Sequence, residues 1–100
     1  MVLVILLRQQ LKRNNIDVLL GAYAKALSLK QYNPDLKVMI AIGGWNEGTK
    51  KYSDMALNSE SRSTFVESVV DFLVMHGFDG LDLDWEYPGD TERGGRWGDK

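Results

Sequence analysis

The chain has 100 residues, and 44% of them are hydrophobic, which is enough for one small core and predicts one domain. A formal net charge of −2 gives no basic field for nucleic acid, and the absence of cysteine excludes disulfides and thiolate metal sites. No stretch approaches the roughly 20 apolar residues of a membrane span, so we expect neither a nucleic-acid nor a membrane partner.

Residues 1–20 are the least informative part of the chain, and they stay unassigned as an atypical N-terminal segment. Met1–Leu7 is apolar, but Arg8 and Lys12 follow it rather than precede it, and no small-residue cleavage site comes after. This order argues against a signal peptide. A helix, or a short strand followed by a polar turn at Asn14–Asn15, both remain open.

The first half of the remaining chain predicts a helix and then a strand. Apolar residues recur at helical spacing from Gly21, and Asn33–Pro34 predicts the end of that helix. The run Leu36–Ile42 is continuously apolar with β-branched residues, which is typical of a strand buried on both faces in a parallel sheet. Residues 48–54 predict a polar loop.

The second half predicts another helix and another strand. Ser59 or Ser61 could cap a helix that carries an apolar stripe and stops at Gly77, after His76. A strand is predicted over 81–85 and a polar, glycine-rich loop over 91–100. The order helix, strand, helix, strand with short connections predicts an α/β fold with parallel strands.

The run FDGLDLDWE, residues 78–86, places four carboxylates in nine residues without a Lys or Arg. Because side chains alternate along a strand, Asp82, Asp84 and Glu86 share one face. Trp85 lies on the other face and is expected to pack there. Acids crowded on one face repel one another and resist burial, and such costly arrangements cluster at functional sites.

Three readings of this acidic strand are open from the residues alone. A solvated edge strand would carry mixed charge, which this run lacks until Arg93. A calcium loop also uses alternate Asp residues, but it needs polar spacers, and the spacers here are Leu and Trp. Glycoside hydrolysis, in which carboxyl groups act as acid and stabiliser, fits an acid at the end of a strand.

The same run resembles the DGxDxDxE signature of family 18 glycoside hydrolases, the chitinases, at all three Asp positions and at Glu86. Ala41–Gly48 (AIGGWNEG) resembles a second motif of this family, at the end of its third barrel strand. Three shorter stretches are similar to animal, especially arthropod, chitinases: Lys51–Met55, Arg93–Gly95 and Asp99–Lys100. The resemblance covers residues 21–100.

The resemblance implies a (β/α)8 barrel, of which residues 21–100 would form a partial catalytic domain with about two βα units, strands three and four. It also implies roles for four acids. Glu86 would protonate the leaving oxygen and then activate water, and Asp84 would orient the substrate's N-acetyl group, whose carbonyl attacks C1. Asp82 would share a proton with Asp84, and Asp79 would support the network.

The resemblance further implies the substrate and its contacts. Chitin or N-acetylglucosamine oligosaccharides would be the partner, and the residues lining the site would be Gly44, Trp45, Asn46 and Tyr87. A core position for Trp45 at the strand end stays open as an alternative. No metal or cofactor is expected, the full-length protein is expected to be a monomer, and family habit implies an extracellular location.

Two alternatives to an active chitinase stay open. One is a chitinase-like protein that binds sugar without cutting it, although relatives of that kind replace the acid, and Glu86 is present here. The other is an inactive truncated product, because a barrel of this type takes about 250 residues. We expect the 100-residue chain to be a fragment or truncated product, weakly folded and inactive by itself.

Overall fold

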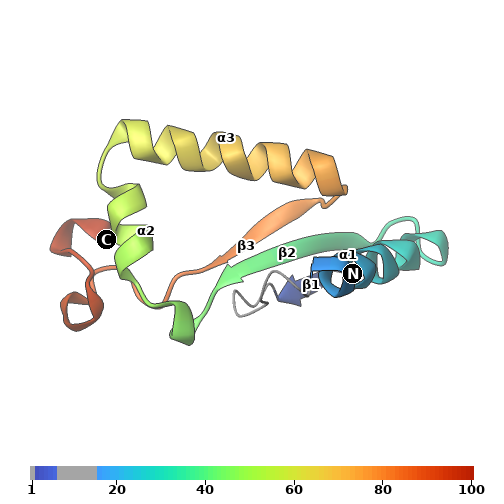
Figure 1. The fold of residues 1–100 in the computed structure, drawn as a ribbon, viewed down its shortest axis with the longest axis horizontal. Helices are drawn as coiled ribbons and strands as arrows, with labels where there is room; N and C mark the ends of the chain where they lie inside the picture. The colour runs from blue at the N-terminus through green and yellow to red at the C-terminus, as the bar shows by residue number, and fades with distance from the viewer. Residues whose placement is uncertain (1, 7–15) are drawn as a thin grey trace. The chain divides into compact units, whose positions relative to one another are not determined.

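The computed structural model describes residues 2–6 and 16–100. Three strands and three helices are labelled in Figure 1: β1 (Val2–Leu6), α1 (Ile16–Ser28), β2 (Lys37–Gly43), α2 (Lys50–Ala56), α3 (Ser59–His76) and β3 (Gly80–Asp84). Short 3-10 turns lie outside these elements, at Leu29–Gln31, Trp45–Glu47, Thr91–Arg93 and Trp97–Asp99. This alternation confirms the α/β class.

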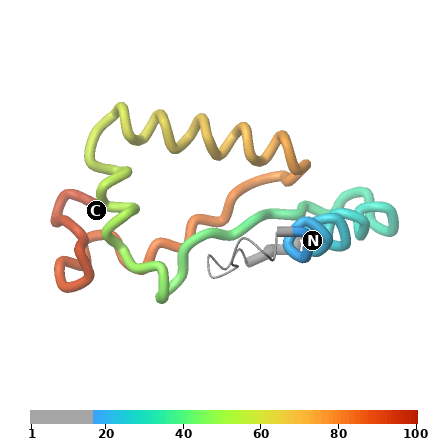
Figure 2. The backbone as a smooth tube through the Cα atoms, in the orientation of Figure 1, coloured from blue at the N-terminus to red at the C-terminus, as the bar shows by residue number. Residues whose placement is uncertain are grey.

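The strands form one sheet in the order β1-β2-β3, and the backbone trace of Figure 2 follows β2 and β3 as neighbouring segments. β1 pairs parallel to β2, with Val2 opposite Lys37 and Leu6 opposite Ala41. The Asp79 amide donates to the Val38 carbonyl at 2.8 Å, and the Gly44 amide donates to the Asp84 carbonyl at 2.7 Å. From the first bond to the second, the residue number increases on both strands, so β2 and β3 run in the same direction.

The expectation of two strands was incomplete, because β1 is a third strand inside the segment that stayed unassigned. Of the two alternatives for that segment, the short strand is the one observed. The expected turn at Asn14–Asn15 lies outside the described residues. α1 begins at Ile16, earlier than the predicted Gly21, and it gives way to the 3-10 turn that ends at Gln31.

β2 has the burial that its apolar run predicts. Val38 and Ile40 are fully buried, and so is Ala41, which follows Ile40 directly. Because successive side chains point to opposite faces, the pair Ile40 and Ala41 shows that both faces are covered. The prediction of a doubly buried strand is confirmed.

Residues 48–54 do not form the polar loop that was predicted, because α2 begins at Lys50. A helix of seven residues is too short to show a periodic apolar pattern in the sequence. The buried residues of α2 are Tyr52 and Ser53. Lys50 and Asp54, one turn apart on the same helix, form an ion pair.

The cap of α3 also differs from the prediction. The helix is capped by the Asn58 side chain rather than by Ser59 or Ser61. Asn58 Oδ1 accepts a hydrogen bond from the Ser61 amide at 2.9 Å. An amide oxygen placed three residues before that N–H is a favoured N-cap geometry. The end of the helix is as predicted, since Gly77 has φ +80° and its N–H bonds the Leu73 carbonyl.

The chain divides into two compact units. The first unit holds Met1–Ile42 and Leu73–Asp82, and the second holds Gly43–Phe72 and Leu83–Lys100. In the first unit, the buried Tyr23 ring lies edge-on to Phe78, with centroids 4.9 Å apart, which confirms Tyr23 as a core residue. Among the described helices, none has the length and apolar character needed to cross a membrane.

Candidate active site

The candidate site is built in the second unit, where the Gly43–Gly44 turn meets the end of β3. Gly43 has φ +104°, and a Cβ on it would overlap the carbonyl oxygen of Asp84. The Gly44 amide donates to that same oxygen at 2.7 Å. Glycine is required at Gly43 both by its positive φ and by this close approach of two backbones.

Of the two acids expected to react with substrate, Asp84 lies at this junction and Glu86 follows it two residues later. Asp84 and Glu86 are both half-buried. A Cβ on Gly44 would lie 3.9 Å from Asp84 Oδ2, so the Asp84 carboxylate reaches the glycine turn. The structure therefore brings Gly44 and Asp84 together.

Thr49 bonds both neighbours of Glu86, the Tyr87 backbone and the Trp85 side chain, a role that the sequence did not indicate. Its side chain is fully buried, and its hydroxyl donates to the Tyr87 carbonyl at 2.9 Å. The same hydroxyl oxygen accepts a hydrogen bond from Trp85 Nε1. Because Trp85 and Tyr87 flank Glu86, this one hydroxyl limits where the carboxyl group can lie.

Trp85 packs, as predicted for the face opposite the acids. It is half-buried, and its ring lies 6.0 Å from that of the buried Tyr52. Packing and the bond to Thr49 together hold the residue next to Glu86.

Glu47 is a second residue that the sequence analysis did not single out. Its side chain is 4% exposed, and its two oxygens take three donors. Oε2 accepts from the Gly43 amide at 3.1 Å, while Oε1 lies 2.8 Å from the Tyr52 hydroxyl and 2.9 Å from Lys51 Nζ. This carboxylate therefore ties the glycine turn to α2.

The Tyr52 hydroxyl faces two carboxylates. Burial, the hydrogen bond to Glu47 and the charges of Glu47 and Asp84 together raise the pKa of Tyr52 above its usual range. The phenol consequently stays protonated and acts as a donor.

The residues expected to line the site differ in exposure. Trp45 and Tyr87 are 57% and 56% exposed, and Asn46 is exposed as well. Trp45 is therefore not the core aromatic that stayed open as an alternative. The Arg93 guanidinium lies over its ring, with Cζ 3.6 Å from the ring centroid.

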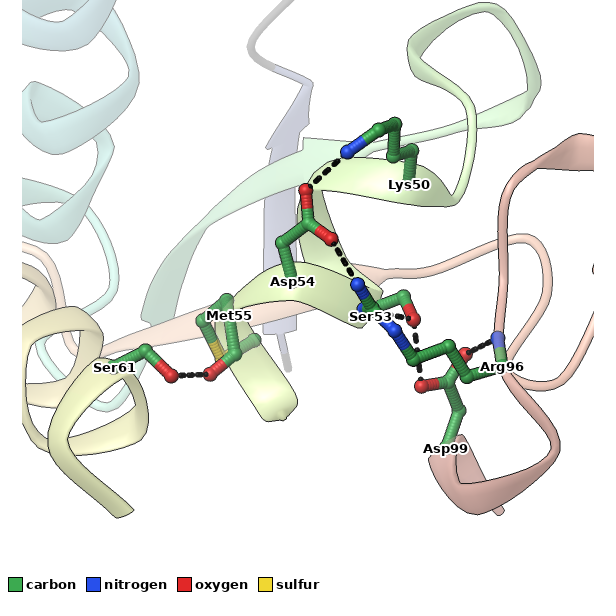
Figure 3. A network of polar contacts seen from close by, with 7 residues as sticks. All are labelled: Lys50, Ser53, Asp54, Met55, Ser61, Arg96 and Asp99. Carbon is green, nitrogen blue, oxygen red and sulfur yellow. Dashed lines mark hydrogen bonds and ion pairs between the residues drawn. The ribbon is translucent and has the colours of Figure 1, made fainter. Parts of the chain in front are cut away.

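The loop that carries Arg93 is anchored on α2 (Figure 3). The Asp54 carboxylate accepts hydrogen bonds from Lys50 at 2.6 Å and from Arg96 at 2.8 Å. These bonds lower the pKa of Asp54, and the bond from Lys50 contributes most. Ser53 receives Arg96 Nη1 at 3.0 Å and donates to Asp99 at 2.8 Å. Two of the stretches that resemble chitinases, Lys51–Met55 and Asp99–Lys100, are thus joined by the bond between Ser53 and Asp99.

Asp79 and Asp82 belong to the first unit. The Asp79 carboxylate accepts from the Val38 amide at 2.8 Å and lies 2.6 Å from Lys30 Nζ. The hydrogen bond from Lys30, followed by that from Val38, lowers the pKa of Asp79. Asp82 is exposed at the third position of β3. In the described part of the chain, no three His, Asp or Glu side chains cluster closely enough to hold a metal ion.

Asp84 ends β3 and Glu86 lies two residues further on, while the turn after β2 carries the exposed Trp45. The sequence profile of glycosyl hydrolases family 18 matches residues 6–96. The chain belongs to this family. The match begins upstream of Gly21, so it also takes in part of the segment that showed no resemblance.

Three comparisons describe the relationship further. The endochitinase of Manduca sexta is 48% identical over 85 residues, which are 85% of this chain and 15% of that protein. The Ostrinia furnacalis Group IV chitinase in complex with allosamidin aligns with a TM-score of 0.68 at 44% identity, over 75% of this chain and 20% of that one. Human YKL-39, described as a pseudo-chitinase with retained chitooligosaccharide binding properties, aligns with a TM-score of 0.63 at 36% identity, over 83% and 21%. The chain thus spans a small part of the length of its relatives.

Proposed function

We propose that this chain supplies the acid/base segment of a retaining, substrate-assisted glycosidase that cleaves β-1,4-linked N-acetylglucosamine in chitin. The observation that carries the proposal is the placement of Glu86 two residues after the end of β3, between two residues held by Thr49. An acid held in one position can meet the glycosidic oxygen without first being ordered. In the whole protein this segment would belong to a (β/α)8 barrel, acting as an extracellular monomer.

The chemistry assigns one task to each carboxylate. Glu86 protonates the leaving oxygen, and later removes a proton from the attacking water. Asp84 orients the substrate's acetamido group and stabilises the positive charge that develops as its carbonyl oxygen bonds to C1. Asp82 shares a proton with Asp84. Asp79 supports the group by fixing the start of β3.

The sugar contacts in this proposal come from the turn after β2 and the segment after β3. Trp45 offers an exposed indole, which suits stacking on a pyranose ring. Gly44, Asn46 and Tyr87 would line the same site. The requirement for an N-acetyl group restricts the substrate to chitin and N-acetylglucosamine oligosaccharides, and the allosamidin complex of the Ostrinia furnacalis chitinase supports a ligand of this class.

The test replaces the matching segment of the Manduca sexta endochitinase with this chain and measures turnover of a fluorogenic chitin oligomer. We expect the chimera to be active, and Glu86→Gln to lower kcat about 10²–10⁴-fold while oligomer binding is retained. Glu67→Gln, the same change at an exposed position of α3, is the matched control. Equal turnover in the Glu86→Gln chimera would overthrow the assignment of Glu86.

A second candidate function is sugar binding without cleavage. The likeness to human YKL-39 favours it, because that protein is described as binding chitooligosaccharides although it is a pseudo-chitinase. The same chimera separates the two functions. Retained oligomer binding with no turnover, in a chimera that still carries Glu86, would support the binding function and contradict the enzyme.

A further inference from the structure

Trp45 and Arg93 contact each other twice within the second unit. The Arg93 Cζ lies 3.6 Å from the centroid of the indole ring, well inside the roughly 6 Å limit of a cation–π interaction. Nη2 of the same guanidinium donates to the carbonyl oxygen of Trp45. One side chain thus holds both the ring and the backbone of the residue expected to meet sugar.

Arg93 reaches this position on a loop whose backbone is closed on itself. The amides of Arg93 and Gly95 both donate to the Asp90 carbonyl, at 3.2 and 2.8 Å. Gly94 has φ +90°, and a Cβ on it would lie 2.9 Å from the Lys50 Cβ, so the loop passes directly against α2. The guanidinium is therefore presented by a fixed segment, which lowers the entropy lost in holding the ring.

No carboxylate explains where the guanidinium lies. Within residues 2–6 and 16–100, Arg93 has no ion pair, and its buried Nη1 has no hydrogen-bond partner. Leaving a buried charged donor unpaired is costly, and an arginine with a purely structural role would gain by meeting an acid. The indole ring and one carbonyl determine this position instead.

Arg93 covers one face of the Trp45 indole, and 57% of the residue remains exposed. We infer that Arg93 is a positioning residue of the sugar site, holding Trp45 so that its opposite face receives a pyranose ring of an N-acetylglucosamine oligomer. This inference rests on the proposed function.

The test uses the chimera described above, with Glu86→Gln to prevent hydrolysis, and measures Kd for the hexamer of N-acetylglucosamine by isothermal titration calorimetry. We expect Arg93→Ala to raise Kd about 3- to 30-fold, the span of cation–π strengths. Arg93→Lys should recover part of this loss, because it keeps the cation but not the planar fork. The double variant Trp45→Ala with Arg93→Ala should bind no more weakly than Trp45→Ala alone, since Arg93 acts through the ring.

Two further measurements separate positioning from general support of the loop. Arg96→Ala removes another anchor of the same loop without touching the indole, and we expect it to leave Kd within about 2-fold. In the ligand-free chain, the side-chain protons of Arg93 should be shifted upfield by the ring current of Trp45. That shift should vanish in Trp45→Ala.

The outcomes distinguish this inference from the proposal beneath it. Binding that depends on Trp45 but not on Arg93, losses that add in the double variant, or an absent ring-current shift would overturn the inference alone. A chimera with the segment otherwise unchanged that binds no hexamer, or a Trp45→Ala chimera that binds as tightly, would overturn the inference together with the sugar contact proposed for Trp45.

Discussion

Thr49 joins the two neighbours of Glu86 through one buried oxygen. Its hydroxyl donates to Tyr87 and accepts from Trp85, so both its proton and a lone pair are used. A buried group with both functions occupied tolerates little change in its neighbours. The position of the candidate acid therefore depends on a residue that is itself fully buried.

Thr49→Val should destabilise the second unit, because valine has nearly the same shape but cannot accept from Trp85 Nε1. An indole donor left without its partner costs about 1–3 kcal/mol. The measurement is the free energy of unfolding in urea, followed by tryptophan fluorescence. Thr49→Ser keeps the hydroxyl and is the control. A Thr49→Val chain as stable as wild type would contradict the importance of this bond.

At the scale of residues, the packing of Trp85 was predicted from the sequence, although β3 ends at Asp84, one residue before it. Glu47, Thr49 and Arg93 were not predicted. Thr49 bonds residues 36 and 38 positions away, and Arg93 bonds a residue 48 positions away. Single-sequence patterns report local spacing, so such distant pairs leave no periodic signal. Glu47 is close in sequence to Gly43, but nothing in AIGGWNEG marks its carboxylate as buried.

At the scale of elements, the start of β3 is fixed by a carboxylate rather than by apolar packing alone. Asp79 precedes the strand, and its side chain accepts the Val38 amide while its own amide bonds the Val38 carbonyl. Lys30, in the 3-10 turn after α1, adds an ion pair to the same carboxylate. One acid thus connects three elements of the first unit.

Asp79→Asn should lower the stability of the chain near neutral pH and leave it unchanged in strong acid. The pKa of Asp79 is lowered in the folded chain by Lys30 and the Val38 amide. A carboxyl group of this kind stabilises the fold above its unfolded pKa of about 3.9, and that contribution is lost as the pH falls through the lower folded value. Urea unfolding at neutral and at strongly acidic pH measures the difference. Asp35→Asn, at an exposed position of the same unit, is the matched control. A loss of stability that is equal at both pH values would contradict the ionic role.

The elements that the sequence predicted well are those with a long or uniform pattern. β2 and α3 were found close to their predicted bounds because an apolar run and a glycine stop marked them. α2 was missed because one and a half turns carry too few positions to show a period. β1 could not be told from a helix, since a short apolar run fits both.

At the scale of the molecule, the core formed by the described residues is small and one face of α3 is exposed. Seven apolar residues are buried among those described: Tyr23, Leu36, Val38, Ile40, Ala41, Tyr52 and Phe78. Four apolar side chains of α3 each keep more than half of their surface exposed: Val66, Val70, Val74 and Met75. Three of these follow one another at four-residue spacing, so they form a single exposed stripe.

We expect the 100-residue chain to unfold over a broad temperature range and to show no turnover of a fluorogenic chitin oligomer. The small core offers little apolar burial to offset chain entropy, and the stripe on α3 should bind an apolar dye. Differential scanning calorimetry with a parallel activity assay is the measurement. Val70→Lys, which places a charge in the stripe, should reduce dye binding. A sharp, cooperative transition together with turnover would show the expectation to be wrong.

The bond between the Gly44 amide and the Asp84 carbonyl makes one proton a reporter for the candidate site. This amide is shielded from water only while the turn after β2 and the end of β3 stay together. Its hydrogen-exchange rate therefore measures how often the two backbones separate, without any substrate or any assay of catalysis. A ligand that bridges Trp45 and Glu86 would slow that exchange, so a single amide could rank ligands by how firmly they close the site.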